Sequence, residues 1–163
     1  MAKDDGHSRL WQIIKDTKFG MLTHRHGDGR LHSQPLTTQN REFDADAPLY
    51  FFVPRDGDIV RHVSTDSNVN LAYASVDDDD YVSISGTASV VEDQAKKDEL
   101  FNPIAKAWFP GGASDPNLAL LAVRILQAEY WKATDSKVVQ LVKMAAAAVT
   151  GKPPADISEH RRV

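Results

Sequence analysis

The chain has 163 residues, no cysteine and a net charge of −4, with 42% hydrophobic and 26% charged residues. This composition is typical of one soluble globular domain. It excludes disulfide bonds and thiolate metal sites, and it lacks the basic stripe that nucleic-acid binding needs. No apolar run reaches the roughly 20 residues of a membrane helix, and the polar start of the chain does not form a leader. We therefore expect a cytoplasmic protein with no membrane or nucleic-acid partner.

The predicted elements follow from the spacing of apolar residues, and strands dominate among them. Val69, Leu71 and Tyr73 alternate as in a half-buried strand, and Gly27-Asp28-Gly29 is a turn signal between two strands of a hairpin. Six short strands favour a barrel over a parallel layered sheet. In chain order we predict a helix over 8–18, strands over 19–23, 31–38 and 48–53, a helix over 56–63, strands over 68–76 and 81–92, a helix over 93–101, a loop over 102–117, a strand over 118–134 and a helix over 137–150.

Helix ends and chain ends are also predicted. Ser8, Asp56 and Asp93 are the expected N-caps, because a side-chain oxygen there accepts from a main-chain N–H that the helix leaves free. A glycine followed by prolines ends the last helix. We predict one domain over residues 1–153 and a polar, disordered tail over 154–163.

The histidines and a run of acids were considered as metal ligands. His24 and His26 lie beside the first hairpin turn and His32 on its second strand, and three histidines can ligate zinc. Since no pattern of supporting partners is evident, we favour surface histidines here, and His62 is interpreted as a surface residue. Asp77-Asp78-Asp79-Asp80 lacks the ligand spacing and turn glycine of a calcium loop. The sequence therefore predicts no metal site.

Aromatic residues are the remaining chemical signal. The chain has no Gly-x-Ser-x-Gly elbow, no Walker loop and no dinucleotide-binding glycine fingerprint. Trp108, Phe109, Tyr130 and Trp131 gather in the last third of the sequence. Strand aromatics usually pack in a core or an interface, which we favour, but they also wall planar ligands.

Four segments in a fixed order carry a resemblance to a known family. They are Trp108-Phe109-Pro110-Gly111-Gly112, Asp115-Pro116, Ala128-Glu129-Tyr130-Trp131 and Lys137-Val138-Val139-Gln140-Leu141. With these segments the chain resembles the general stress protein branch of the pyridoxamine 5′-phosphate oxidase-like superfamily over residues 10–151. The resemblance implies a mainly β fold with flanking helices. It also implies a six-stranded split β-barrel that binds FMN at a homodimer interface.

The resemblance further implies which residues meet the flavin. The second strand lies along the isoalloxazine ring, the end of the third strand and the next helix hold the phosphate, and a tryptophan approaches from the partner subunit. The implied cofactor-binding residues are His32, Ser33, Gln34, Pro35, Val53, Arg55, Asp58, Arg61 and Trp131.

The phosphate segment departs from the family pattern. Gly57 and Ile59 stand where the family usually carries a serine and a lysine, and Asp58 adds an anion. Losing one charge-assisted contact costs about 1.5–3 kcal/mol, or roughly ten- to hundredfold in affinity. Arg55 and Arg61 are the expected replacements, because a guanidinium holds phosphate through two N–H groups.

The segment after Trp131 departs as well. True pyridoxine phosphate oxidases carry an Arg-Leu-His-x-Arg motif, and residues 137–141 lack its histidine and second arginine. We therefore exclude vitamin B6 oxidation and assign no catalytic residue. Three interpretations stay open: an FMN-binding stress-type protein with low flavin-dependent oxidoreductase activity, a non-catalytic split-barrel binding protein that has lost the flavin, and a reductase for another flavin or a deazaflavin. In each case we predict a homodimer with Trp131 and the Trp108 loop near its interface.

Overall fold

The computed structural model describes residues 2–133, 136–154 and 158–163, and its centre is a seven-stranded antiparallel sheet. The strand order is β2-β1-β4-β5-β6-β3, with β7 paired to β6. The elements in chain order are α1 (Ala2–Thr17), β1 (Phe19–Arg25), β2 (Leu31–Thr37), β3 (Leu49–Pro54), α2 (Asp58–Val63), β4 (Asn68–Ser75), β5 (Asp80–Val91), α3 (Gln94–Leu100), α4 (Pro103–Trp108), the 3₁₀ turn η1 (Gly112–Ser114), β6 (Leu118–Ala133), α5 (Lys137–Thr150) and β7 (Ser158–Arg162).

The sheet curls until its two outer strands, β2 and β3, approach each other. Just beyond β2, the main-chain N–H of Gln39 donates to the carbonyl of Tyr50 on β3 at 2.9 Å. The Asn40 side chain adds two bonds, donating to the Pro48 carbonyl at 2.9 Å and accepting from the Tyr50 N–H at 2.7 Å. These contacts confirm the predicted mainly β, split-barrel fold.

The core fills the inside of this curl, and α1 and α2 pack against it. Each helix contributes apolar residues, as the predicted spacing requires. The largest buried core side chains are Leu10, Ile13, Ile14, Leu22, Leu49, Phe51, Ile59, Leu71, Tyr73, Ile84 and Tyr130.

A β-bulge divides β6 into two halves. Ser85 pairs with Gln127, whereas Gly86 pairs with Ile125, so Leu126 is an extra residue on β6. A Cβ on Gly86 would lie 2.3 Å from the Arg124 carbonyl oxygen, which explains the glycine at this close approach of two backbones.

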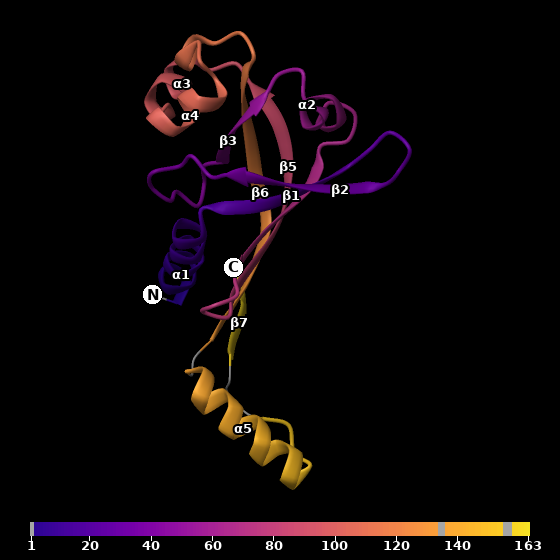
Figure 1. Cartoon of the computed structure of the whole chain (residues 1–163), viewed down its shortest axis with the longest axis vertical. Helices are drawn as coiled ribbons and strands as arrows, with labels where there is room; N and C mark the ends of the chain where they lie inside the picture. The colour runs from indigo at the N-terminus through magenta and orange to yellow at the C-terminus, as the bar shows by residue number, and fades with distance from the viewer. Residues whose placement is uncertain (1, 134–135, 155–157) are drawn as a thin grey trace.

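Below the barrel, the first residues of β5 and the last residues of β6 continue as an arm. Strand β7 lies beside this arm and α5 lies at its far end (Figure 1). None of the described residues of α5 is buried. No helix in the part of the chain that the structure describes has both the length and the apolar character needed to cross a membrane.

The predicted disordered tail is wrong over Ser158–Arg162, which form β7, the strand that raises the count from six to seven. The tail is polar because β7 is an exposed edge strand. Its order comes from contacts that a sequence pattern does not reveal. Glu159 accepts from the Tyr130 hydroxyl at 2.8 Å and pairs with Arg9.

Two predicted caps are also wrong. Ser8 lies inside α1, which begins at Ala2, and α2 has Gly57 rather than Asp56 at its N-cap. The Asp93 cap is confirmed, because its side chain accepts from the Lys96 N–H at 3.0 Å. The predicted loop over 102–117 contains the short helix α4 and the turn η1.

Candidate functional site

The four β2 residues implied as flavin contacts divide between two faces of the sheet. Cross-strand neighbours share a face. His32 and Gln34 lie opposite buried residues of β1, so they point toward the inside of the curl. Ser33 and Pro35 lie on the other face, where Ser33 is opposite the half-buried Thr23. Only Ser33 and Pro35 can therefore contribute side chains to a ligand on the convex side.

That convex side, which we call the outer face, is continuous across five strands. One row of paired residues runs through Pro35, Met21, Ala72, Ser83 and Glu129, on β2, β1, β4, β5 and β6 in turn. All five are at least partly exposed. A flat ligand placed here would contact several strands at once.

Short hydrogen bonds fix the polar side chains on the outer face. The hydroxyls of Thr23 and Ser33 lie 2.5 Å apart, and the Asn70 amide donates to the Ser83 hydroxyl at 3.1 Å. These bonds hold hydroxyl and amide groups in fixed positions beside the exposed apolar side chain of Met21. Apolar surface with a few oriented polar groups is typical of a small-molecule site.

Trp131 lies on the same outer face. It is two residues after Glu129 and follows Tyr130, whose side chain is fully buried on the inner side. Its ring stacks on His160 of β7, with centroids 4.8 Å apart and an interplanar angle of 5°. The tail strand therefore holds the tryptophan that the resemblance assigns to the flavin.

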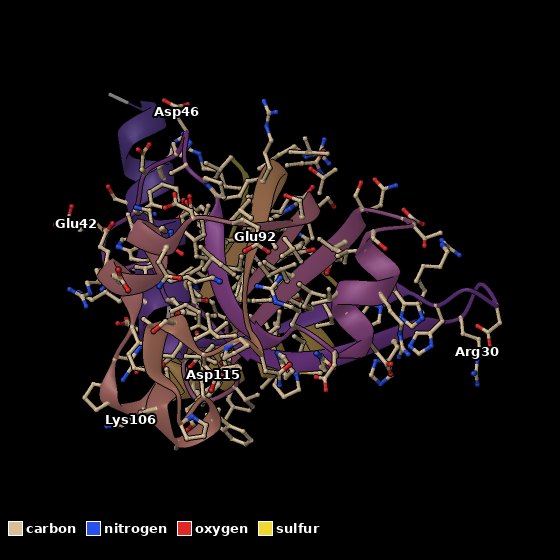
Figure 2. The ribbon with its side chains drawn as sticks, turned by 90° about the horizontal axis from the view of Figure 1, so that it is seen from above. Arg30, Glu42, Asp46, Glu92, Lys106 and Asp115 are labelled. Atoms are coloured by element: carbon tan, nitrogen blue, oxygen red, sulfur yellow. The ribbon has the colours of Figure 1, made fainter. Side chains whose placement is uncertain are left out.

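The phosphate segment is occupied by internal contacts. Val53 is buried and supports the barrel. Arg55 donates to Glu92 at 2.6 Å and to the Pro116 carbonyl at 3.1 Å. The Arg55 hydrogen bond, followed by its charge, lowers the pKa of Glu92 below its ordinary value. Figure 2 shows Glu92 over the middle of the sheet, far from Arg30 at the tip of the β1–β2 hairpin.

The start of α2 shows the same internal pairing. Asp58 forms an ion pair with Arg61 one turn later. Ile59 is only 1% exposed and belongs to the core, so its side chain does not face a phosphate. A Cβ on Gly57 would lie 3.0 Å from the Pro54 carbonyl oxygen, which leaves little room for the family's serine.

The structure gathers four histidines, adding His62 to the three hairpin histidines that the sequence analysis weighed together as metal ligands. His24, His26 and His62 each place one ring nitrogen within 4.8 Å of the others, and the His32 ring lies 5.5 Å from that of His24. The prediction of surface histidines is wrong for His24, which is 1% exposed. The spacing of His24 at the end of β1 and His26 just after it was a usable signal, whereas nothing in the sequence placed His62 beside them.

The acidic run Asp77-Asp78-Asp79-Asp80 borders a separate pocket, where the arm formed by β5 and β6 begins. This pocket of about 420 Å³ is lined by Asp16, Asp77, Asp78, Asp79, Asp80, Lys132, Ala133, Ser136, Lys137 and Gln140. Asp80 is largely buried and accepts from Lys132 at 3.0 Å.

The chain is similar to known proteins over most of its length. The model of the family described as pyridoxamine 5′-phosphate oxidase like matches residues 5–155. The chain belongs to this family. It is 28% identical over 153 residues to Protein bli-3 of Neurospora crassa, covering 88% of this chain and 73% of that protein.

Solved structures of similar proteins share the fold. The general stress FMN/FAD binding protein of Xanthomonas citri is 33% identical, with a TM-score of 0.71 and coverage of 82% of this chain and 92% of that one. The general stress protein 26 of Bacillus anthracis strain Sterne is 24% identical, with a TM-score of 0.67 and coverage of 76% and 92%. The latter likeness shows the fold alone.

In this member of the pyridoxamine 5′-phosphate oxidase like family, the surface implied for the flavin ring suits FMN better than the segment implied for the phosphate. The outer face offers apolar area and oriented hydroxyls that suit a planar ring. At the other end, Arg55 and Arg61 are each paired with a carboxylate. A phosphate would compete with Glu92 and Asp58 for these guanidinium groups.

Proposed function

We propose that this chain binds FMN on the outer face of its sheet, with Ser33, Pro35 and Trp131 against the ring and Arg55 and Arg61 toward the phosphate. The observation that carries the proposal is the continuous, hydrogen-bonded outer face in a member of this family. The Xanthomonas citri relative, named an FMN/FAD binding protein, supports the same ligand class.

A second copy of the chain would complete this site. Phe19 and Met21 are 61% and 42% exposed, and Tyr81 of β5 is 38% exposed. Exposed apolar side chains on one sheet face are typical of an interaction surface. We propose a homodimer in which the outer faces of two chains enclose the ring and exclude water from it.

A bound flavin would supply the redox chemistry, and the protein would position and shield it. The outer face includes hydroxyls, amides and the carboxylate of Glu129, which accepts from Arg162 at 2.8 Å and lies 3.2 Å from a ring nitrogen of His160. These groups can orient a ring and a substrate by hydrogen bonds. We propose a low flavin-dependent reductase activity and assign no acid or base.

A second function is favoured by the paired arginines. If Glu92 and Asp58 hold Arg55 and Arg61 permanently, the barrel is a non-catalytic scaffold that has lost its flavin. The two functions differ in a single property, the affinity for flavin.

The deciding experiment is a titration of flavin-stripped protein with FMN, followed by flavin fluorescence and by the thermal midpoint. Micromolar or tighter binding, with a rise in the midpoint, supports the flavoprotein. Unchanged fluorescence and an unchanged midpoint at saturating FMN would overturn it and support the scaffold. Parallel titrations with riboflavin and FAD show which side chain of the flavin is preferred. A titration with a deazaflavin tests the preference for the ring. Light scattering at micromolar protein tests the dimer.

A further inference from the structure

A cluster of four imidazole rings lies on the inner side of the β1–β2 hairpin, under α2. His24 and His26 are two residues apart on or just after β1, so their side chains share a face. His32 is paired directly with His24 across the hairpin. His62 reaches the same place from α2, with its ring centroid 5.3 Å from that of His24 and 4.2 Å from that of His26. Three elements thus converge on one point.

The buried nitrogens of this cluster have no partner among the residues that the structure describes. They are Nδ1 and Nε2 of His24, Nε2 of His26 and Nδ1 of His62. A neutral imidazole has one donor and one acceptor nitrogen, and a buried polar atom without a partner costs stability. Four such atoms in one place therefore point to a missing partner that imidazole nitrogens share.

The chemistry of imidazole nitrogens suits a metal cation as that partner. Burial, and then the neighbouring histidines, lower the pKa of His24 and of His26. A neutral imidazole has a nitrogen lone pair, and this is the form of histidine that ligates a metal ion. Asp28 raises the pKa of His26, whereas Arg30 lowers it.

We propose that His24, His26 and His62, with His32 as a fourth ligand, form a site for one divalent transition-metal ion of the zinc class. An all-imidazole set favours zinc, copper or nickel over magnesium or calcium. Tetrahedral zinc at about 2.0–2.1 Å from nitrogen places its ligands roughly 3.4 Å apart. The ligand nitrogens of His24, His26 and His62 lie within 4.8 Å of one another, so binding of the ion would draw them closer together. His32, the most exposed of the four histidines, would complete the four-coordinate set.

Such an ion would join α2 to the β1–β2 hairpin. It uses the inner side of the sheet, so it is separate from the proposed flavin face. Of the residues implied for the flavin, only His32 is shared, and its side chain points toward the cluster. The metal site therefore stands or falls independently of flavin binding.

The test uses full-length, flavin-stripped protein without a polyhistidine tag, freed of metal by a chelator. Zn²⁺ is titrated against a chromophoric competitor, and Co²⁺ absorption reports tetrahedral nitrogen ligation. We expect one Zn²⁺ per chain and a raised thermal midpoint. His26→Gln and His62→Gln should each weaken binding by at least about 100-fold, because losing even a supporting partner of a ligand costs roughly 10–100-fold.

His7→Gln is the matched control, since His7 lies on α1 against Phe43 and outside the cluster. It should bind Zn²⁺ like the wild type. The variants avoid the fully buried His24, and circular dichroism checks that each is folded. Absence of Zn²⁺ binding by the wild type would overturn the proposal. Undiminished binding by a folded His26→Gln/His62→Gln double variant would overturn it equally.

Discussion

Arg55 donates to both carboxylate oxygens of Glu92, at 2.6 and 3.4 Å, while its remaining N–H groups hold the carbonyls of Pro116 and Leu118. The guanidinium thus joins the end of β3 to the end of β5 and the start of β6. Arg55, which we propose as a replacement for the family's phosphate-binding lysine, is therefore also a structural link, and Glu92 would compete with any phosphate for its guanidinium.

Glu92→Gln should tighten FMN binding severalfold. The change removes the negative charge that pairs with Arg55 and leaves the carbonyl contacts in place. Fluorescence titration of the stripped protein measures the effect. Glu99→Gln is the control, because Glu99 is also exposed and paired, in its case with Lys96, and the charge change is identical. Equal effects of the two substitutions would show that Arg55 does not meet the phosphate.

Ile59→Lys should destabilise the protein rather than restore a phosphate ligand. Ile59 is 1% exposed, so the new ammonium would be buried without a partner. We expect a loss of about 3–5 kcal/mol in the free energy of unfolding, the typical cost of an uncompensated buried charge. Urea unfolding measures it, with Ile59→Met as a volume-conserving control that should cost less than about 1.5 kcal/mol. Unchanged stability together with tighter FMN binding would contradict this.

Much of the barrel was predictable because its strands alternate. In β4, Val69, Leu71 and Tyr73 all face the core as their spacing predicted. The β1–β2 hairpin followed from its glycine turn. These features are local, and the pattern of one segment is enough to specify them.

The site was less predictable because it depends on which segments meet. His62 joins His24 only through the packing of α2 on β1, and Ile59 was aligned with a ligand position although its side chain packs inward. The polar segment of β7 has no apolar alternation, and only pairing with β6 orders it. Each of these relationships is tertiary, so no single segment records it.

Tyr73→Phe should change how stability depends on alkaline pH. The Tyr73 ring is 1% exposed and its hydroxyl lies 2.6 Å from that of Thr38. Burial raises the pKa of Tyr73 to about 12. Between pH 10 and about 12 the phenol ionises in the unfolded chain but not in the folded one, so wild-type stability falls as pH rises. The full difference of two pKa units corresponds to about 2.7 kcal/mol.

Near pH 8, Tyr73→Phe should be less stable than the wild type by about 1 kcal/mol, since the hydrogen bond to Thr38 is lost. The gap should shrink as pH rises past about 10, because phenylalanine does not titrate. Urea unfolding at several pH values follows this change, and the other tyrosines and lysines contribute equally to both proteins. A gap that stays constant would mean that the buried phenol does not resist ionisation.

The extra residue Leu126 also determines what the far half of β6 presents to solvent. Before it, the core positions are Ala119, Leu121 and Val123; after it, they are Ala128 and Tyr130. The core-facing positions of β6 are therefore odd-numbered before Leu126 and even-numbered after it. Without this change Trp131, which is odd-numbered, would face the core. Leu126 itself is 63% exposed, so replacing its side chain should be tolerated. Deleting it should turn Tyr130 outward and Trp131 inward, so that the length of the strand here matters more than the identity of the residue.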